Sequence, residues 1–148
     1  MVAVTASPHM EAIPGWHAHQ CSFERVIASE STKRIPIFVA PFRCELGEVA
    51  LINSTAVSGR ATNYVNFNLI NGGAEGAGTT ELAARDLASG TDLDAGKTLL
   101  LDATSSGEVF LSAGDILELE SEEAGNGLAA DINQLSVYVA FRPANLSS

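Results

Sequence analysis

The sequence predicts an all-β protein, an antiparallel β-sandwich or jelly roll of about eight or nine strands preceded by an extended N-terminal arm. Three observations support this fold class. The chain has 148 residues, the size of a single domain. From residue 20 onward its segments are short, rich in β-branched and aromatic residues, and bounded by Gly, Asn, Asp, Ser or Pro. No stretch of about 10–12 residues carries a helical stripe of apolar side chains.

Residues 1–19 are expected to form an arm outside the β-sandwich domain of residues 20–148. The arm contains Pro8, Pro14 and Gly15 and shows neither strand nor helix periodicity. Fully stretched, it would span up to about 60 Å and reach well beyond its own domain. An arm of this length could therefore contact a neighbouring protein.

Trp16 is the only tryptophan of the chain and lies in this arm. A large isolated aromatic side chain there either anchors the arm on a neighbour or folds back onto its own domain, and the sequence leaves both open. His17 and His19 lie on one side of an extended chain, but two imidazoles are too few for a metal site unless copies of the arm share it. Partner contacts are expected from Ile13, Pro14, Trp16, His17 and His19.

The expected strands follow from alternation and turn residues. Alternation is clearest in 64–69, 116–120 and 135–141, and it predicts that the side chains of Glu118, Glu120 and Glu122 face solvent. Pro36 cannot donate a ladder hydrogen bond, so its strand is expected at a sheet edge or with a bulge. Residues 81–88 fit a short helix or a strand, and the surrounding pattern favours a strand. The full set is 21–28, 34–40, 46–54, 63–70, 79–86, 97–102, 107–111, 115–122 and 135–142.

The charge distribution limits the partners. The net charge is −10, and because residues 1–60 hold equal numbers of acidic and basic side chains, residues 61–148 carry all of it. A chain this acidic repels phosphate backbones and anionic lipid, which argues against nucleic acid or membrane partners. The N-terminal residues lack the pattern of a secretory signal, so synthesis in a cytoplasm is expected. Cys21 and Cys44 are expected to be free, buried thiols.

No motif supports catalysis, and neither a cofactor nor a resident metal is predicted. Residues 90–98 resemble a phosphate-binding loop, but the first glycine is misplaced and no helix is expected to follow. The glutamates of 118–123 follow one strand and do not face each other across a cleft, as a glycosidase requires. The glycine-rich segment 71–78 is either a hairpin connection, which its composition favours, or a plastic contact loop.

The stretch from Lys33 to Pro143 resembles the small jelly-roll decoration proteins, also called cement or head auxiliary proteins, of tailed bacteriophages. The resemblance is carried by five segments of modest specificity: 38–41 (FVAP), 63–69 (NYVNFNL) leading into the glycine-rich turn, 113–119 (AGDILEL), 125–129 (GNGLA) and the final strand 137–143.

This resemblance implies a structural virion protein without enzymatic activity. It would bind the outer surface of an icosahedral phage head as a homotrimer, with N-terminal arms laid over neighbouring subunits of the major capsid protein. The alternative is a receptor- or glycan-binding module of a tail fibre or virion surface, which would use exposed aromatic side chains in a shallow groove. The candidates for that groove are Trp16, Tyr64 and Tyr138.

Overall fold

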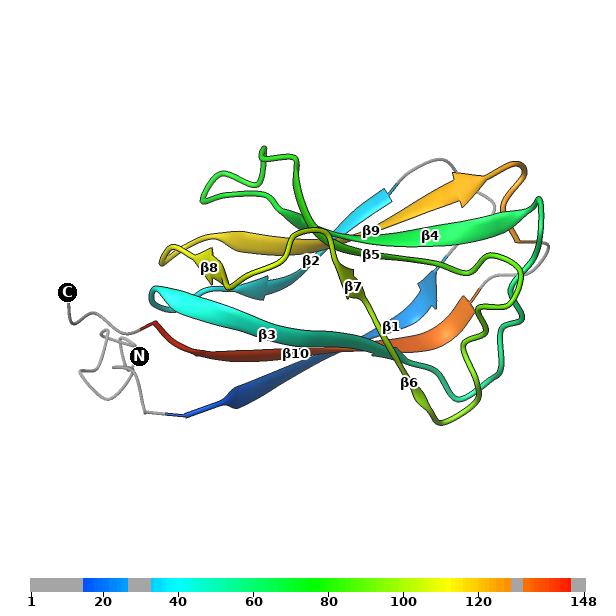
Figure 1. The fold of residues 1–148 in the computed structure, drawn as a ribbon, viewed down its shortest axis with the longest axis horizontal. Coiled ribbons are helices and arrows are strands. Elements are labelled where there is room, and N and C mark those ends of the chain that lie inside the picture. The colour runs from blue at the N-terminus through cyan, green and yellow to red at the C-terminus, as the bar shows by residue number, and fades with distance from the viewer. Residues whose placement is uncertain (1–14, 27–32, 129–131, 145–148) are drawn as a thin grey trace, which may run out of the picture.

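The fold is a β-sandwich (Figure 1), seen in a computed structural model that describes residues 15–26, 33–128 and 132–144. Ten strands form two antiparallel sheets that pack face to face, which confirms the predicted fold class. Within the described residues, no helix is long and apolar enough to cross a membrane.

The first sheet has the strand order β1-β10-β3-β6, and β8 also pairs with β3. Its strands are β1 (His17–Val26), β3 (Cys44–Ile52), β6 (Thr98–Leu100), β8 (Val109–Leu111) and β10 (Ile132–Pro143). The second sheet has the order β2-β9-β4-β5-β7. Its strands are β2 (Lys33–Val39), β4 (Tyr64–Asn71), β5 (Thr80–Asp86), β7 (Asp102–Ala103) and β9 (Ile116–Ala124).

The pairing is nested along the chain. The outermost strands β1 and β10 pair, then β2 with β9, then β3 with β6 and β8, and finally β4 with β5. Successive pairs alternate between the two sheets, as when one long antiparallel ribbon is rolled into a sandwich. This is a jelly-roll arrangement, and it brings the chain's first and last described strands together.

Most predicted strands are present with boundaries close to those expected. The segment with two possible structures is strand β5, and Pro36 lies in the edge strand β2, where the pairing register with β9 shifts between Pro36 and Phe38. Three differences are larger. β1 begins at His17, so the last three residues of the predicted arm belong to the first sheet. The predicted strand 97–102 is divided into β6 and β7, which lie in different sheets, and β10 begins at Ile132, three residues before the predicted start. Residues 1–14 of the predicted arm lie outside the described part of the chain.

The core lies between the two sheets and is built by alternate residues of the long strands. Val65, Phe67 and Leu69 of β4 face the core, with exposed fractions of at most 1 %. Leu135, Val137 and Val139 of β10 face them from the other sheet, equally buried. At the end of the sandwich where β1 begins and β10 ends, the core finishes in a cluster of rings in which the centroids of Phe38 and Phe141 lie 4.8 Å apart.

Candidate docking surface

The outer face of the first sheet is ordered into rows by the strand register. Arg142 of β10 pairs with Glu45 of β3, and Glu45 pairs in turn with Phe110 of β8. Trp16 directly precedes His17, the first residue of β1, which pairs with Phe141. Side chains alternate between the two faces of a strand, so Trp16, Arg142, Glu45 and Phe110 form one row across the face.

Stacked and paired contacts hold this row together. The Arg142 guanidinium lies 4.8 Å from the centre of the Trp16 ring, and its Nε donates a hydrogen bond of 2.6 Å to Glu45 Oε2. At the other end, the Arg43 guanidinium lies 4.6 Å from the centre of the Phe110 ring. A hollow of about 440 Å³ opens between these groups, and Glu108 and Pro143 complete its lining. We call Trp16, Arg142, Glu45, Phe110 and Arg43 the aromatic–arginine row.

Trp16 is packed on its own domain and still open to solvent. Its ring covers Gly47 so closely that a Cβ at that position would lie 2.5 Å from Trp16 Cζ3. Its exposed fraction is nevertheless 51 %. The two alternatives left open by the sequence therefore do not exclude each other, because one ring face is held by the domain while the rest remains available to a partner.

The other predicted contact residues do not gather around Trp16. His17 and His19 point to the opposite side of β1, where their rings lie 5.6 Å from Phe141 and 5.7 Å from Phe38. The period-two alternation of the strand separates them from Trp16. Ile13 and Pro14 lie outside the described residues. Across the described ranges, no three His, Cys, Asp or Glu side chains gather as a metal-ligand set.

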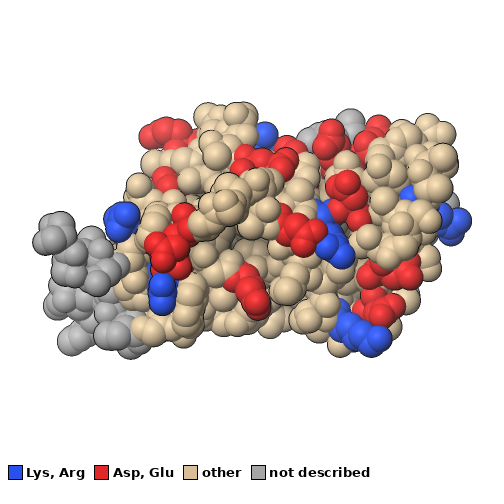
Figure 2. Space-filling model, in the orientation of Figure 1, with Lys and Arg blue, Asp and Glu red and all other residues tan. Residues whose placement is uncertain are grey.

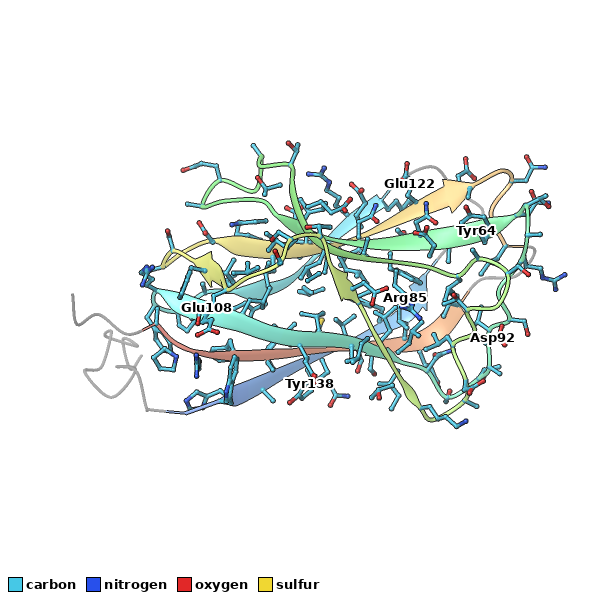
Figure 3. The ribbon with its side chains drawn as sticks, viewed as in Figure 1. Tyr64, Arg85, Asp92, Glu108, Glu122 and Tyr138 are labelled. Carbon is cyan, nitrogen blue, oxygen red and sulfur yellow. The ribbon has the colours of Figure 1, made fainter. Side chains whose placement is uncertain are left out.

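Two further rows of this face carry no charged side chain. Gln20, Tyr138, Ala50 and Leu100 form one row, and Ser22, Ser136, Ile52 and Thr98 form the next. Among the described residues, five large hydrophobic side chains are exposed, and four of them lie on this face: Trp16, Phe110, Leu100 and Tyr138. Figure 3 shows Tyr138 projecting away from the sandwich on the side opposite to Glu122. A sheet face that exposes several large hydrophobic side chains in this way is typical of a contact surface.

The outer face of the second sheet is acidic, and here one prediction was wrong. Glu118, Glu120 and Glu122 do project outward, but Glu118 and Glu120 are only 6 % and 9 % exposed rather than solvated. Arg34 of the neighbouring β2 covers them, with its Nε 2.7 Å from Glu120 Oε2 and its Nη1 3.9 Å from Glu118 Oε2. Figure 2 shows acidic groups along the upper margin and a mostly tan lower margin beneath β1 and β10.

Hydrogen bonds hold Glu120 in its charged form. Burial by itself raises the pKa of this carboxyl, but the hydrogen bonds from Arg34 and Asn68 and the positive charge of Arg34 more than offset it, so the pKa lies below its ordinary value. Asn68 Nδ2 donates to Glu120 Oε1 at 3.0 Å and also reaches Glu122 Oε2 at 3.3 Å. The carboxylate of Glu120 therefore receives its hydrogen bonds from neighbouring side chains of the same sheet.

The glycine-rich segment completes this cover. It is the connection of the β4–β5 hairpin, as its composition favoured, with positive φ at Gly73 and Gly76. It folds over Glu118, because a Cβ on Gly72 would lie 2.9 Å from Glu118 Oε1. Arg34 Nη1 donates to the carbonyl oxygen of Gly78 at 2.9 Å, so one arginine links β2, β9 and the hairpin connection.

Two further predictions are resolved by the structure. The segment that resembles a phosphate-binding loop leads into the short strand β6 and not into a helix. Cys21 and Cys44 are both free thiols, Cys44 fully buried and Cys21 partly buried. Burial raises the pKa of the Cys44 thiol to about 11, with a smaller contribution from the charge of Asp115. A thiol of this kind is a packing group and not a nucleophile.

Sequence reasoning identified Trp16 but missed the rest of the row. Arg43, Glu45, Phe110 and Arg142 are scattered over the chain, and only the register of β10, β3 and β8 brings them together. One signal was present in the sequence. The predicted strand 21–28 alternates at Cys21, Ser22 and Phe23, and extending this period backwards puts His17 and His19 on the side of Cys21 and Trp16 on the side of Ser22.

The comparisons with known proteins agree with this architecture. Neither a family model nor a curated protein matches the chain. A chain of the cyanophage Pam1 capsid asymmetric unit superposes with a TM-score of 0.51 at 17 % identity, over 97 % of this chain and 100 % of that one. Chains of the infectious bursal disease virus Gx strain and of its T13 particle give TM-scores of 0.37, and this chain spans 33 % and 31 % of their lengths. The cyanophage likeness shows a shared fold.

Proposed function

We propose that this protein is a non-enzymatic structural protein of a virion, a decoration or cement protein that binds the outer surface of an icosahedral phage head and stabilises it. The observation that carries the proposal is the aromatic–arginine row, which lies open on the sheet face that holds four of the five exposed large hydrophobic side chains of the described residues. The fold shared with a chain of the cyanophage Pam1 capsid asymmetric unit supports it, and that match extends over the whole of a chain of similar length.

The row has the properties of an interface core. Tryptophan, phenylalanine and arginine dominate the binding energy of protein interfaces, whereas isolated surface charges contribute little. Arg142 is already fixed by Glu45 and by the Trp16 ring, so little side-chain freedom is lost when a partner binds. The hollow beside Phe110 can receive one side chain of the partner. The major capsid protein is the partner we propose.

The finer features of the proposal concern assembly. We place the protein on the capsid as a homotrimer, with residues 1–14 laid over neighbouring capsid subunits. Trp16 supports this placement, because it belongs to the aromatic–arginine row and follows residues 1–14 almost directly in the sequence. Contacts made by those residues would extend the interface without a larger core.

The direct test is co-sedimentation with expanded empty shells of the phage that encodes the chain. We expect the wild-type protein to sediment with shells and Trp16→Ala and Phe110→Ala to weaken binding roughly tenfold to a hundredfold each. Val39→Ala is the matched control, because Val39 is 56 % exposed but belongs to the second sheet. It should bind normally.

Each outcome decides a part of the proposal. A wild-type protein that stays in the supernatant would refute the decoration role. If both the Trp16→Ala and the Phe110→Ala variants bind shells as tightly as the wild type, the aromatic–arginine row is not the docking surface. A chain lacking residues 1–14 that binds as well as the full chain would remove the role of those residues. A molar mass of the purified protein, measured by light scattering, that corresponds to one or two chains instead of three would refute the homotrimer.

A further inference from the structure

A second hollow lies on the outer face of the first sheet, at the end away from the aromatic–arginine row. Its volume is about 630 Å³. Six polar residues of its lining come from β1, β10 and the chain that follows β3, and we call them the hydroxyl–amide groove: Gln20, Ser22, Asn53, Ser54, Gln134 and Ser136. Ser22 follows Trp16 by six residues along one strand, a separation of about 20 Å. The two sites therefore share no residue.

The groove is chemically distinct from the rest of this acidic protein. Its six polar residues are three carboxamides and three hydroxyls, and none of the described residues that line it is charged. Ile52 and Phe23 supply its apolar part. The described lining offers no cation to a phosphate or carboxylate ligand and no carboxylate to a cationic ligand. The lining suits a ligand that is neutral and rich in hydrogen-bonding groups.

Much of the hydrogen-bonding capacity of the groove is unused. Ser22 Oγ and Ser136 Oγ share one hydrogen bond of 2.8 Å, which leaves the hydrogen of one hydroxyl free. The contact from Ser54 Oγ to Gln134 Oε1 is 3.5 Å, too long to be strong. Asn53 is 2 % exposed and donates from Nδ2 to the Thr55 carbonyl, but its Oδ1 accepts no hydrogen bond from the described residues.

The backbone at the rim is strained. Gln134 has a φ of +57° and is the one non-glycine residue with positive φ in the described part of the chain. Glutamine gains nothing from this conformation, which costs about 1–2 kcal/mol. The strain directs an exposed carboxamide toward Ser54 at the groove. Backbone strain of this kind is concentrated at binding sites.

We propose that the hydroxyl–amide groove binds a neutral oligosaccharide. Sugar hydroxyls donate and accept hydrogen bonds at once, which matches the paired serine hydroxyls and the carboxamides of Gln20 and Gln134. The less polar C–H face of a sugar ring fits Ile52 and the ring of Tyr138, which is 38 % exposed in the adjacent row of the same sheet face. The proposal does not depend on capsid binding, because the two surfaces lie at opposite ends of the sheet.

The test uses an array of neutral, sialylated and sulfated glycans, followed by NMR titration of the labelled full chain with the strongest neutral glycan. We expect binding to neutral glycans, with shift changes at Ser22, Gln134 and Ser136. The double variant Ser22→Ala, Ser136→Ala should bind about fivefold to tenfold more weakly. Gln134→Asn should do the same, because asparagine tolerates positive φ but is one carbon shorter.

Ser105→Ala is the matched control, since Ser105 is an exposed serine outside the groove, and it should bind as the wild type does. Four results would overturn the proposal. These are no binding to any neutral glycan, binding confined to charged glycans, shift changes away from the groove, or unchanged affinity in both groove variants. Normal thermal unfolding of the variants shows that a loss of binding is not a loss of fold.

Discussion

The two outer faces of the sandwich differ in whether their polar groups are bonded within the domain or exposed to solvent. On the second sheet, Arg34, Asn68 and the glycine-rich hairpin connection cover Glu118 and Glu120, so the acidic face satisfies itself within the domain. On the first sheet, hydroxyls, amides and aromatic rings stay exposed, and one arginine–glutamate pair is its only ion pair in the described residues. The second sheet has the more charged outer face, but its charges are satisfied within the domain. The less charged outer face of the first sheet is the one whose groups remain available to a partner.

The largest effect should come from removing the central arginine of each face. Arg34→Ala leaves the carboxylates of Glu118 and Glu120, whose side chains are only 8 % and 11 % exposed, without their cation. It also removes the hydrogen bond to the Gly78 carbonyl oxygen. Arg142→Ala removes the cation of only one carboxylate, that of Glu45. We expect Arg34→Ala to lower Tm by about 5–10 °C and Arg142→Ala by about half as much.

Differential scanning calorimetry measures both shifts. Adding Glu120→Gln to Arg34→Ala should recover part of the loss, because an amide is cheaper to leave without a cation than a carboxylate. Equal Tm values for the two single variants would mean that the second face is not held together by its charges and that the contrast between the faces is only one of composition.

The fold was predictable from local patterns, whereas the contrast between the faces was not. Alternation alone puts Glu118 and Glu120 on the outside of their strand. Whether an outward side chain meets water depends on what the next strand brings beside it, and nothing in the sequence around residue 118 indicates Arg34 of β2. The same holds for Phe110, whose place beside Glu45 comes from the pairing of β8 with β3, two strands separated in the chain by β4, β5, β6 and β7. Nested pairing of distant strands is a property of the whole chain.

The acidic face should also make stability depend on pH. The pKa of Glu120 lies below its ordinary value in the folded protein, so its charged form stabilises the fold above about pH 4.3, its unfolded pKa. That contribution is lost as the pH falls through the folded pKa. The groups around it are Arg34 on β2, Asn68 on β4, and Glu118 and Glu122 on β9.

Glu120→Gln should therefore lower the free energy of unfolding by about 1–2 kcal/mol at pH 7 and by much less at pH 3. Urea unfolding at the two pH values measures the difference. Glu81→Gln is the control, because Glu81 is exposed on the same sheet, and its effect should be small at both. A penalty for Glu120→Gln that is the same at pH 3 and pH 7 would contradict the role of the charge.

Gly47→Ala should have the smallest effect on stability, but it should specifically displace the Trp16 ring on the outer face of the first sheet. The added Cβ would lie 2.5 Å from the Trp16 ring, which must leave its place on Arg142. A stacked guanidinium contributes about 0.5–1 kcal/mol at an exposed site, so the free energy of unfolding should fall by no more than about 1 kcal/mol. Since Trp16 is the only tryptophan, its fluorescence should shift to longer wavelength. Leu100→Ala, on the same face, should leave the spectrum unchanged. If Gly47→Ala alters neither the spectrum nor shell binding, the ring is not held where docking requires it.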